Sequence, residues 1–77
     1  MDEPMSLETM EFMVWIIEIA AREFFCGNKT TAYDALKSSG IWELYTEHYD
    51  VTHTLGSEYL LEEMRERFNK CGVSISC

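Results

Sequence analysis

The sequence is short of positive charge. Its 77 residues hold 6 Lys and Arg against 14 Asp and Glu, which gives a formal net charge of −8 at pH 7. Nucleic acids and anionic membranes are bound through Lys and Arg, so we expect neither as a partner. A basic protein would be attracted by such a field, although an acidic surface is also an ordinary means of staying soluble.

A long apolar run is missing as well. The charge-free stretch of the most apolar segment, Phe12 to Ile17, is far shorter than the roughly 20 residues that cross a bilayer as a helix. The chain starts with Met1, Asp2 and Glu3, whereas a secretory signal starts with basic residues. The 3 cysteines are an odd set that indicates no disulfide framework. These absences predict a cytoplasmic protein.

The sequence also lacks a recognisable metal or catalytic pattern. His48 and His53 are not spaced to share a helical face, and no cysteine or carboxylate completes a zinc site around them. Cys71 and Cys77 have no second pair, and we interpret Cys26 and Cys71 as small buried residues at helix ends. Short helices offer little concave surface for catalysis. We therefore expect no metal, no cofactor, no catalytic residue and no enzymatic activity.

Hydrophobic residues are plentiful, at 47% of the chain, and 13% of the residues are aromatic. This content predicts a folded protein rather than a disordered one. Apolar residues recur with helical spacing, so the predicted fold class is all-α: a compact bundle of three main helices plus one short helix. The predicted helices are 7–26, 31–39, 41–49 and 57–71. They form a single domain over 1–77, with frayed ends at 1–5 and 73–77.

Capping residues and glycines set these helix limits. Side-chain oxygens accept hydrogen bonds from the first free amides of a helix, and glycine commonly follows its last turn. The predicted N-caps are Ser6, then Thr30 or Thr31, then Ser57. The predicted stops are Gly27, Gly40 and Gly72.

The last predicted helix has a simple division of faces. Its apolar residues are three or four positions apart and form one stripe, which suits a helix with a single buried face. The stripe comprises Leu60, Leu61, Met64, Phe68 and Cys71. On the other face, Glu63 with Arg67 and Glu66 with Lys70 are favourable pairs at a spacing of four residues.

The first predicted helix is apolar over about two thirds of its circumference. Its polar arc contains Glu8, Glu11, Glu18 and Arg22. Trp15 lies inside that arc, so its ring either covers Ile19 or a neighbouring loop, or serves as an interface anchor. Three short helices are not expected to cover so wide an apolar surface, which predicts a homodimer or a protein partner. The candidate interface residues are Trp15, Met10, Met13 and Ile17.

The segment Tyr49 to Gly56 is the most distinctive. We predict that it is a connecting loop in which Asp50 forms an Asx-type turn and His53 donates to Asp50 or to a helix carbonyl. Thr54 is a second candidate cap for the last helix. This interpretation makes the segment a structural joint, and a small-ligand or enzymatic site around Tyr49, Asp50 and His53 is the alternative.

The run from Tyr49 to Glu63 resembles the signature of the domain of unknown function 3791 family. The shared pattern is an aromatic-Asp-x-x-His-Thr segment that leads into an acidic helix. The apolar first helix and the Thr-Ala-x-x-Ala-Leu-Lys second helix are also similar, so the resemblance spans Met10 to Lys70. Its motif positions here are Tyr49, Asp50, His53, Thr54 and Gly56. The sequence departs from the pattern at Arg65 and Arg67 and in its C-terminal tail.

This resemblance implies a small helical bacterial protein without an established activity. Members of the family are often encoded beside other small genes, some of which resemble ADP-ribosyltransferase-type toxins. By analogy, the resemblance implies an antitoxin-like partner of a neighbouring gene product, and it brings no catalytic role to the motif positions. The leading hypothesis is therefore a protein–protein interaction module. The alternatives are the small-ligand or enzymatic site and a purely structural, stand-alone domain.

Overall fold

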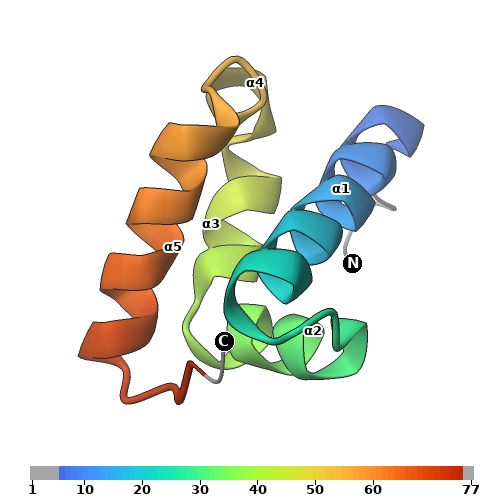
Figure 1. Cartoon of the computed structure of the whole chain (residues 1–77). Coiled ribbons are helices and arrows are strands. Elements are labelled where there is room, and N and C mark those ends of the chain that lie inside the picture. Colours follow the sequence, from blue (N-terminus) through green and yellow to red (C-terminus); the bar gives the residue numbers. More distant parts are fainter. Residues whose placement is uncertain (1–5, 76–77) are drawn as a thin grey trace.

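The computed structural model describes residues 6–75, and helices joined by turns and loops are the only regular secondary structure in that range. The helices are α1 (Leu7–Phe24), α2 (Lys29–Ser38), α3 (Ile41–Glu47), α4 (Tyr49–Thr52) and α5 (Ser57–Lys70) (Figure 1). The prediction of an all-α bundle is confirmed. The predicted helix over 41–49 is wrong in its C-terminal part, because the chain breaks at His48 and starts a separate turn, α4.

The helices enclose one hydrophobic core. α1 packs against α2, α3 and α5, and Figure 1 shows α3 between α1 and α5, with α2 and α4 at opposite ends of the bundle. Burial of these apolar side chains is the main driving force for folding. The buried core comprises Met13, Ile16, Ala20, Ala21, Phe24, Phe25, Ala32, Ala35, Leu36, Ile41, Tyr45, Leu60, Met64 and Phe68.

The predicted capping residues are correct only at α1. The Ser6 hydroxyl accepts a hydrogen bond from the Thr9 amide at 3.2 Å. At α2 the prediction of Thr30 or Thr31 is wrong, because the Asn28 side chain is already in place to accept from the Thr31 amide, at 3.0 Å. The helix therefore begins two residues earlier than expected.

The start of α5 also differs from its prediction. Ser57 is the first helical residue rather than the cap, and Gly56 is the N-cap, with φ −72° and ψ 157°. Glycine has no side chain, so no cap hydrogen bond forms there. The helix limits of the prediction nevertheless hold at this end, because Gly56 leaves the chain extended up to Ser57.

The two longest helices end differently. α1 ends at Phe24 rather than at residue 26, because Cys26 and Gly27 have positive φ values of 54° and 86°. α5 ends at Lys70, one residue before the predicted limit of 71, and the predicted stop Gly72 follows with φ 75°. The Val73 amide donates to the Phe68 carbonyl at 2.9 Å, which closes a Schellman motif.

The C-terminal tail contributes to the core. Val73 and Ile75 are half-buried and pack against the core, so the prediction of a frayed end is wrong for these two residues. The rest of the predicted frayed segments, residues 1–5 and 76–77, lies outside the described residues.

The prediction that Cys26 and Cys71 are buried is wrong. Cys26 and Cys71 are both exposed; Cys26 is disulfide-bonded and Cys71 has a free thiol. Over residues 6–75, no helix combines the length and the apolarity that a membrane span requires. In the same range, no three His, Cys, Asp or Glu side chains are grouped so that they could hold a metal ion.

Candidate functional site

The motif segment forms a helical turn rather than the predicted loop. Residues Tyr49–Thr52 form α4, and the His53 amide donates to the Tyr49 carbonyl at 2.9 Å. Thr52 is buried, so it fixes the turn against the bundle. A single turn is too short to produce a helical period in the sequence, which is why the pattern indicated a loop.

His53 is bound to the turn that precedes it. Its Nδ1 lies 2.6 Å from the Tyr49 carbonyl oxygen, and its ring stacks on the Tyr49 ring at 4.5 Å with an interplanar angle of 15°. A carbonyl can only accept, so Nδ1 carries the proton. The Tyr49 ring in turn meets the Phe12 ring edge-on at 5.5 Å. The predicted bond to a helix carbonyl is thus confirmed. The contact between the Tyr49 and Phe12 rings connects α4 with α1.

Asp50 and Thr54 differ from their predicted roles. The Asp50 side chain is exposed and makes no hydrogen bond with any other residue in 6–75, so the Asx-type turn is absent there. Thr54 donates to the Val51 carbonyl at 2.6 Å and does not cap α5. Tyr49, Asp50, His53 and Thr54 line none of the pockets described below.

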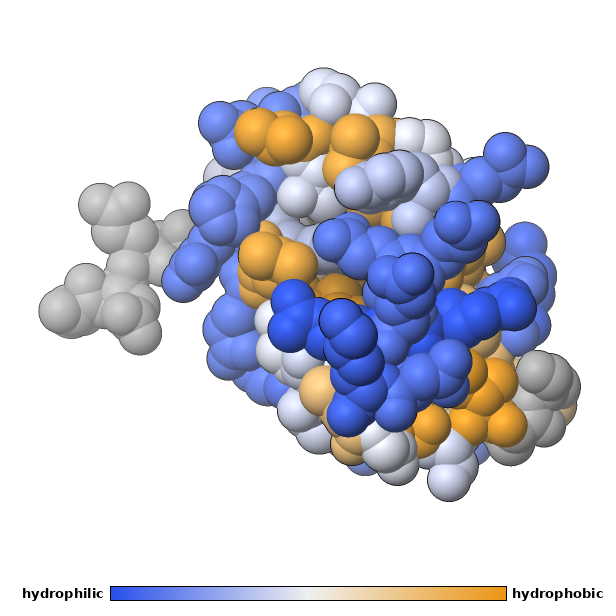
Figure 2. Space-filling view, turned by 90° about the vertical axis from the view of Figure 1, so that its left-hand side faces the viewer, coloured by the Kyte–Doolittle hydropathy of each residue, from blue (hydrophilic) through white to orange (hydrophobic). Residues whose placement is uncertain are grey.

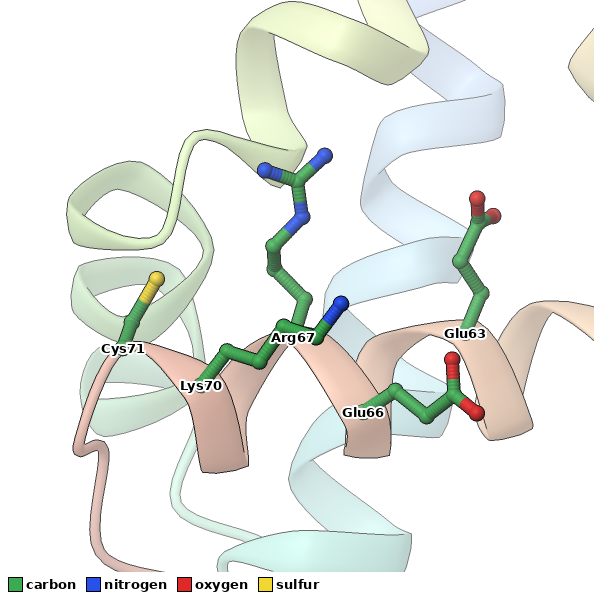
Figure 3. Close-up of a pocket in the computed structure, with 5 residues that line it drawn as sticks. All are labelled: Glu63, Glu66, Arg67, Lys70 and Cys71. Atoms are coloured by element: carbon green, nitrogen blue, oxygen red, sulfur yellow. The ribbon is translucent and has the colours of Figure 1, made fainter.

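An open pocket of about 440 Å³ lies along the C-terminal half of α5. Figure 3 shows its five lining side chains projecting from α5 and the residue that follows it: Glu63, Glu66, Arg67, Lys70 and Cys71. The pocket mixes both charge signs and pairs Cys71 with no histidine base. Figure 2 shows the α5 side of the molecule covered mainly by hydrophilic side chains. This arrangement is typical of a solvated helix face.

Glu63 has a structural partner beside this pocket. The hydroxyl of the buried Tyr45 donates a hydrogen bond to Glu63 Oε1 at 3.0 Å. Burial, together with the negative charge of Glu63, raises the pKa of Tyr45 well above its usual range. Within the described chain, Glu63 forms no ion pair with Arg67. The predicted pairing on this face is therefore wrong, because Glu63 faces Tyr45 instead.

A second apolar row on α1 is left uncovered. Leu7, Met10 and Val14 are 69%, 48% and 59% exposed, and Ile17 is half-buried. Their spacing of three and four residues places them along one line on the helix. We call these four residues the apolar strip. The strip is separate from the buried face of α1, so α1 has more apolar surface than the core of the bundle buries.

The strip leads into a shallow groove between α1 and α2. This groove has a volume of about 360 Å³ and its exposed lining is mainly apolar. An ion pair between Glu18 and Lys29, 3.9 Å apart, joins the two helices at its edge. The lining residues are Val14, Ile17, Glu18, Lys29, Thr30 and Tyr33.

The predicted interface residues separate into three groups. Met10 and Ile17 belong to the strip, whereas Met13 is 1% exposed and lies in the core, so its interface prediction is wrong. Trp15 is 39% exposed, outside the strip, and its ring lies 5.8 Å from the Phe12 ring.

Three exposed residues of this surface were not predicted: Leu7, Val14 and Tyr33. The first two were detectable, because with Met10 and Ile17 they repeat every three or four positions. Tyr33 was not, since only the packing of α2 on α1 brings it to the groove.

The comparisons with known proteins give one decisive match. The family described as Protein of unknown function (DUF3791) matches residues 11–70. The chain belongs to the DUF3791 family. This confirms the resemblance found around Tyr49 to Glu63. Neither a curated protein nor a solved structure matches the DUF3791 chain.

The DUF3791 match covers one of the two candidate surfaces completely and the other only in part. It contains the whole motif segment and, from the strip and groove, Val14, Ile17 and Tyr33. Leu7 and Met10 precede it. The DUF3791 description names no activity, so a function has to be argued from the surfaces of this chain.

Proposed function

We propose that this DUF3791 chain is a protein-interaction module that acts without catalysis. Its docking surface is the apolar strip of α1 together with the groove between α1 and α2. The observation that supports this proposal is the exposure of Leu7, Met10 and Val14 in one row, on a helix whose adjacent face already fills the core.

The three exposed residues of the strip, Leu7, Met10 and Val14, are not part of the buried core. Met13, Ile16 and Ala20 form the buried row of α1, each at 1% exposure or less. Replacing exposed apolar residues with polar ones would leave that row intact. A contiguous exposed apolar surface bordered by polar residues is typical of a binding site.

The groove gives the docking surface a concave site beside the strip. It lies where Val14, Ile17 and Tyr33 meet, so an apolar side chain of a partner would contact both α1 and α2. Interfaces gain most of their affinity from a few such anchors in pockets near the centre. The strip and the groove together thus offer both a line of contact and one anchoring point.

The finer form of the proposal is an antitoxin-like or escort role toward the product of a neighbouring gene. It is supported by the family resemblance, whose members are often encoded beside other small genes. A test must therefore identify the partner and the docking surface together.

The experiment is co-expression of the tagged chain with each adjacent gene product, followed by co-purification. We expect one product to co-purify with the wild type and to be lost with Val14→Glu, which places a charge in the strip. The matched control is Val51→Glu, because Val14 and Val51 are equally exposed at 59%.

Two results would count against the proposal. One is that no adjacent product co-purifies while the chain stays monomeric by light scattering. The other is a complex that survives Val14→Glu and is lost with Val51→Glu, which would move the docking surface to α4.

A further inference from the structure

The charges around the apolar strip are one-sided. On a helical projection, Glu8, Glu11 and Glu18 follow one long edge of the strip, and the other edge turns into the core row that contains Met13. Glu8 and Glu11 form no ion pair with another described residue, and only Glu18 is neutralised, by Lys29. The exposed edge along Leu7 to Ile17 is therefore negative, and Arg22 of the same polar arc lies C-terminal to the strip.

A second copy of this chain fits such an edge poorly. A two-fold interface would bring the same surface together from both copies. Each copy carries a net charge of −8, and two cations of α2 are already engaged: Lys29 with Glu18, and Lys37 over the Trp42 ring at 5.9 Å. Like charges would face each other at the rim, which disfavours association.

We infer that the strip binds an amphipathic helix of a partner protein, with apolar anchors on one face and Lys or Arg along one flank. This inference rests on the proposed function and specifies its partner. Leu7 to Ile17 span about 15 Å at the α-helical rise, which is close to three turns. A partner helix of that length presents anchors at positions i, i+3 or i+4, and i+7.

The two parts of this recognition have separate roles. The strip and the groove supply apolar contact, which gives most of the affinity. The negative edge selects the flank of the partner helix and speeds the encounter, which makes the binding sensitive to salt. Substitutions can therefore remove one part and leave the other.

The experiment is a selection from a displayed library of three-turn amphipathic helices. The anchors are fixed as apolar residues, and the flanking positions are randomised. We expect Lys and Arg to be enriched about threefold at one flank among binders of the wild type, a preference in the range of an exposed ion pair. With Glu8→Lys/Glu11→Lys as the target, the enriched flank residues should become Asp and Glu.

Controls separate this inference from the proposed function. Glu62→Lys, an exposed site on α5, should leave the flank preference unchanged, and Val14→Glu should abolish binding of every selected helix. Binders that depend on Val14 but have no basic flank would overturn the inference and leave the proposed function standing.

The remaining outcomes are equally clear. A selection without any binder that depends on Val14 would overturn both proposals. A dimer by light scattering at micromolar concentration, lost with Val14→Glu, would overturn the basic helix in favour of a second copy.

Discussion

α1 and α5 are both amphipathic helices on the same core, and they differ in what they present to solvent. α5 uses its apolar stripe in the core and exposes a largely charged face, which is the side seen in Figure 2. α1 fills the core with one apolar row and exposes a second, the strip. The core accounts for the aliphatic residues and Phe68 of α5, and Tyr59 is the exposed aromatic residue there. The core does not account for the strip, which is therefore the surface on which a function is to be sought.

The largest effects should come from the rows that both helices bury. Phe68 on α5 is fully buried and meets the rings of Phe24 and Phe25 at 5.5 and 5.7 Å. Phe68→Ala should lower the free energy of unfolding by about 3–5 kcal/mol, and Ile16→Ala on α1 by about 2–5 kcal/mol. Urea denaturation followed by circular dichroism measures both. A loss below about 1 kcal/mol at either site would mean that the two helices do not share one core.

A smaller effect should come from the hydrogen bond between Tyr45 of α3 and Glu63 of α5, which has no counterpart on α1. Tyr45→Phe removes the hydroxyl that donates to Glu63 and should lower the free energy of unfolding by about 1 kcal/mol near neutral pH. The same denaturation experiment measures it. An unchanged free energy of unfolding would show that water satisfies Glu63 equally well once the tyrosine hydroxyl is removed.

The same tyrosine predicts a pH dependence. Its folded pKa is raised above the ordinary value of 10.0, so the stabilisation is complete below pH 10 and is lost as the pH rises above it. There the unfolded chain releases the proton and the folded chain retains it. The stability difference between wild type and Tyr45→Phe should shrink by up to about 1.4 kcal/mol per pH unit above pH 10. A difference that stays constant up to pH 11 would contradict this.

The link between the exposed faces of the two helices should matter less still. Arg65 on α5 lies 3.5 Å from the Glu23 carboxylate on α1 and 5.5 Å from the centre of the Phe24 ring. Because both charged groups are well exposed, Arg65→Ala should cost about 0.5–1 kcal/mol. High salt should remove the ionic part of the difference. A salt-independent loss would assign the effect to packing on Phe24.

The smallest effect should come from the strip itself. Val14→Glu should change the free energy of unfolding by no more than about 0.5 kcal/mol, because the side chain is 59% exposed and packs little. Val51→Glu serves as the equally exposed control on α4. A loss above about 1 kcal/mol for Val14→Glu alone would place the strip within the core and remove the contrast between α1 and α5.

The sequence was most informative where a helix has one apolar face. The spacing of Leu60, Met64 and Phe68 predicted α5 and its buried side, since only one orientation buries that stripe. Gly40 and Gly72 marked helix ends correctly, because both residues have positive φ values, 82° and 75° respectively. Such left-handed positions are unfavourable for residues with a side chain.

The sequence was least informative on α1 and at the short turns. With two thirds of α1 apolar, the pattern could not show which row faces the core, so Met13 was assigned to the interface and Val14 was missed. Near α2, Thr30 and Thr31 were the two predicted caps, whereas the chain that leaves the turn at Cys26 and Gly27 has Asn28 as the N-cap. These outcomes depend on tertiary packing, which no local pattern contains.

The contact between Tyr33 and Trp42 has an optical consequence. Tyr33 lines the groove, and its ring lies edge-on to the Trp42 indole, with the ring centres 5.0 Å apart. A side chain that enters the groove must press on Tyr33 and so alter the surroundings of the indole. Trp42 is one of 2 tryptophans, and Trp15→Phe leaves it as the only one. In that variant the intrinsic fluorescence of the chain becomes a label-free signal of groove occupancy.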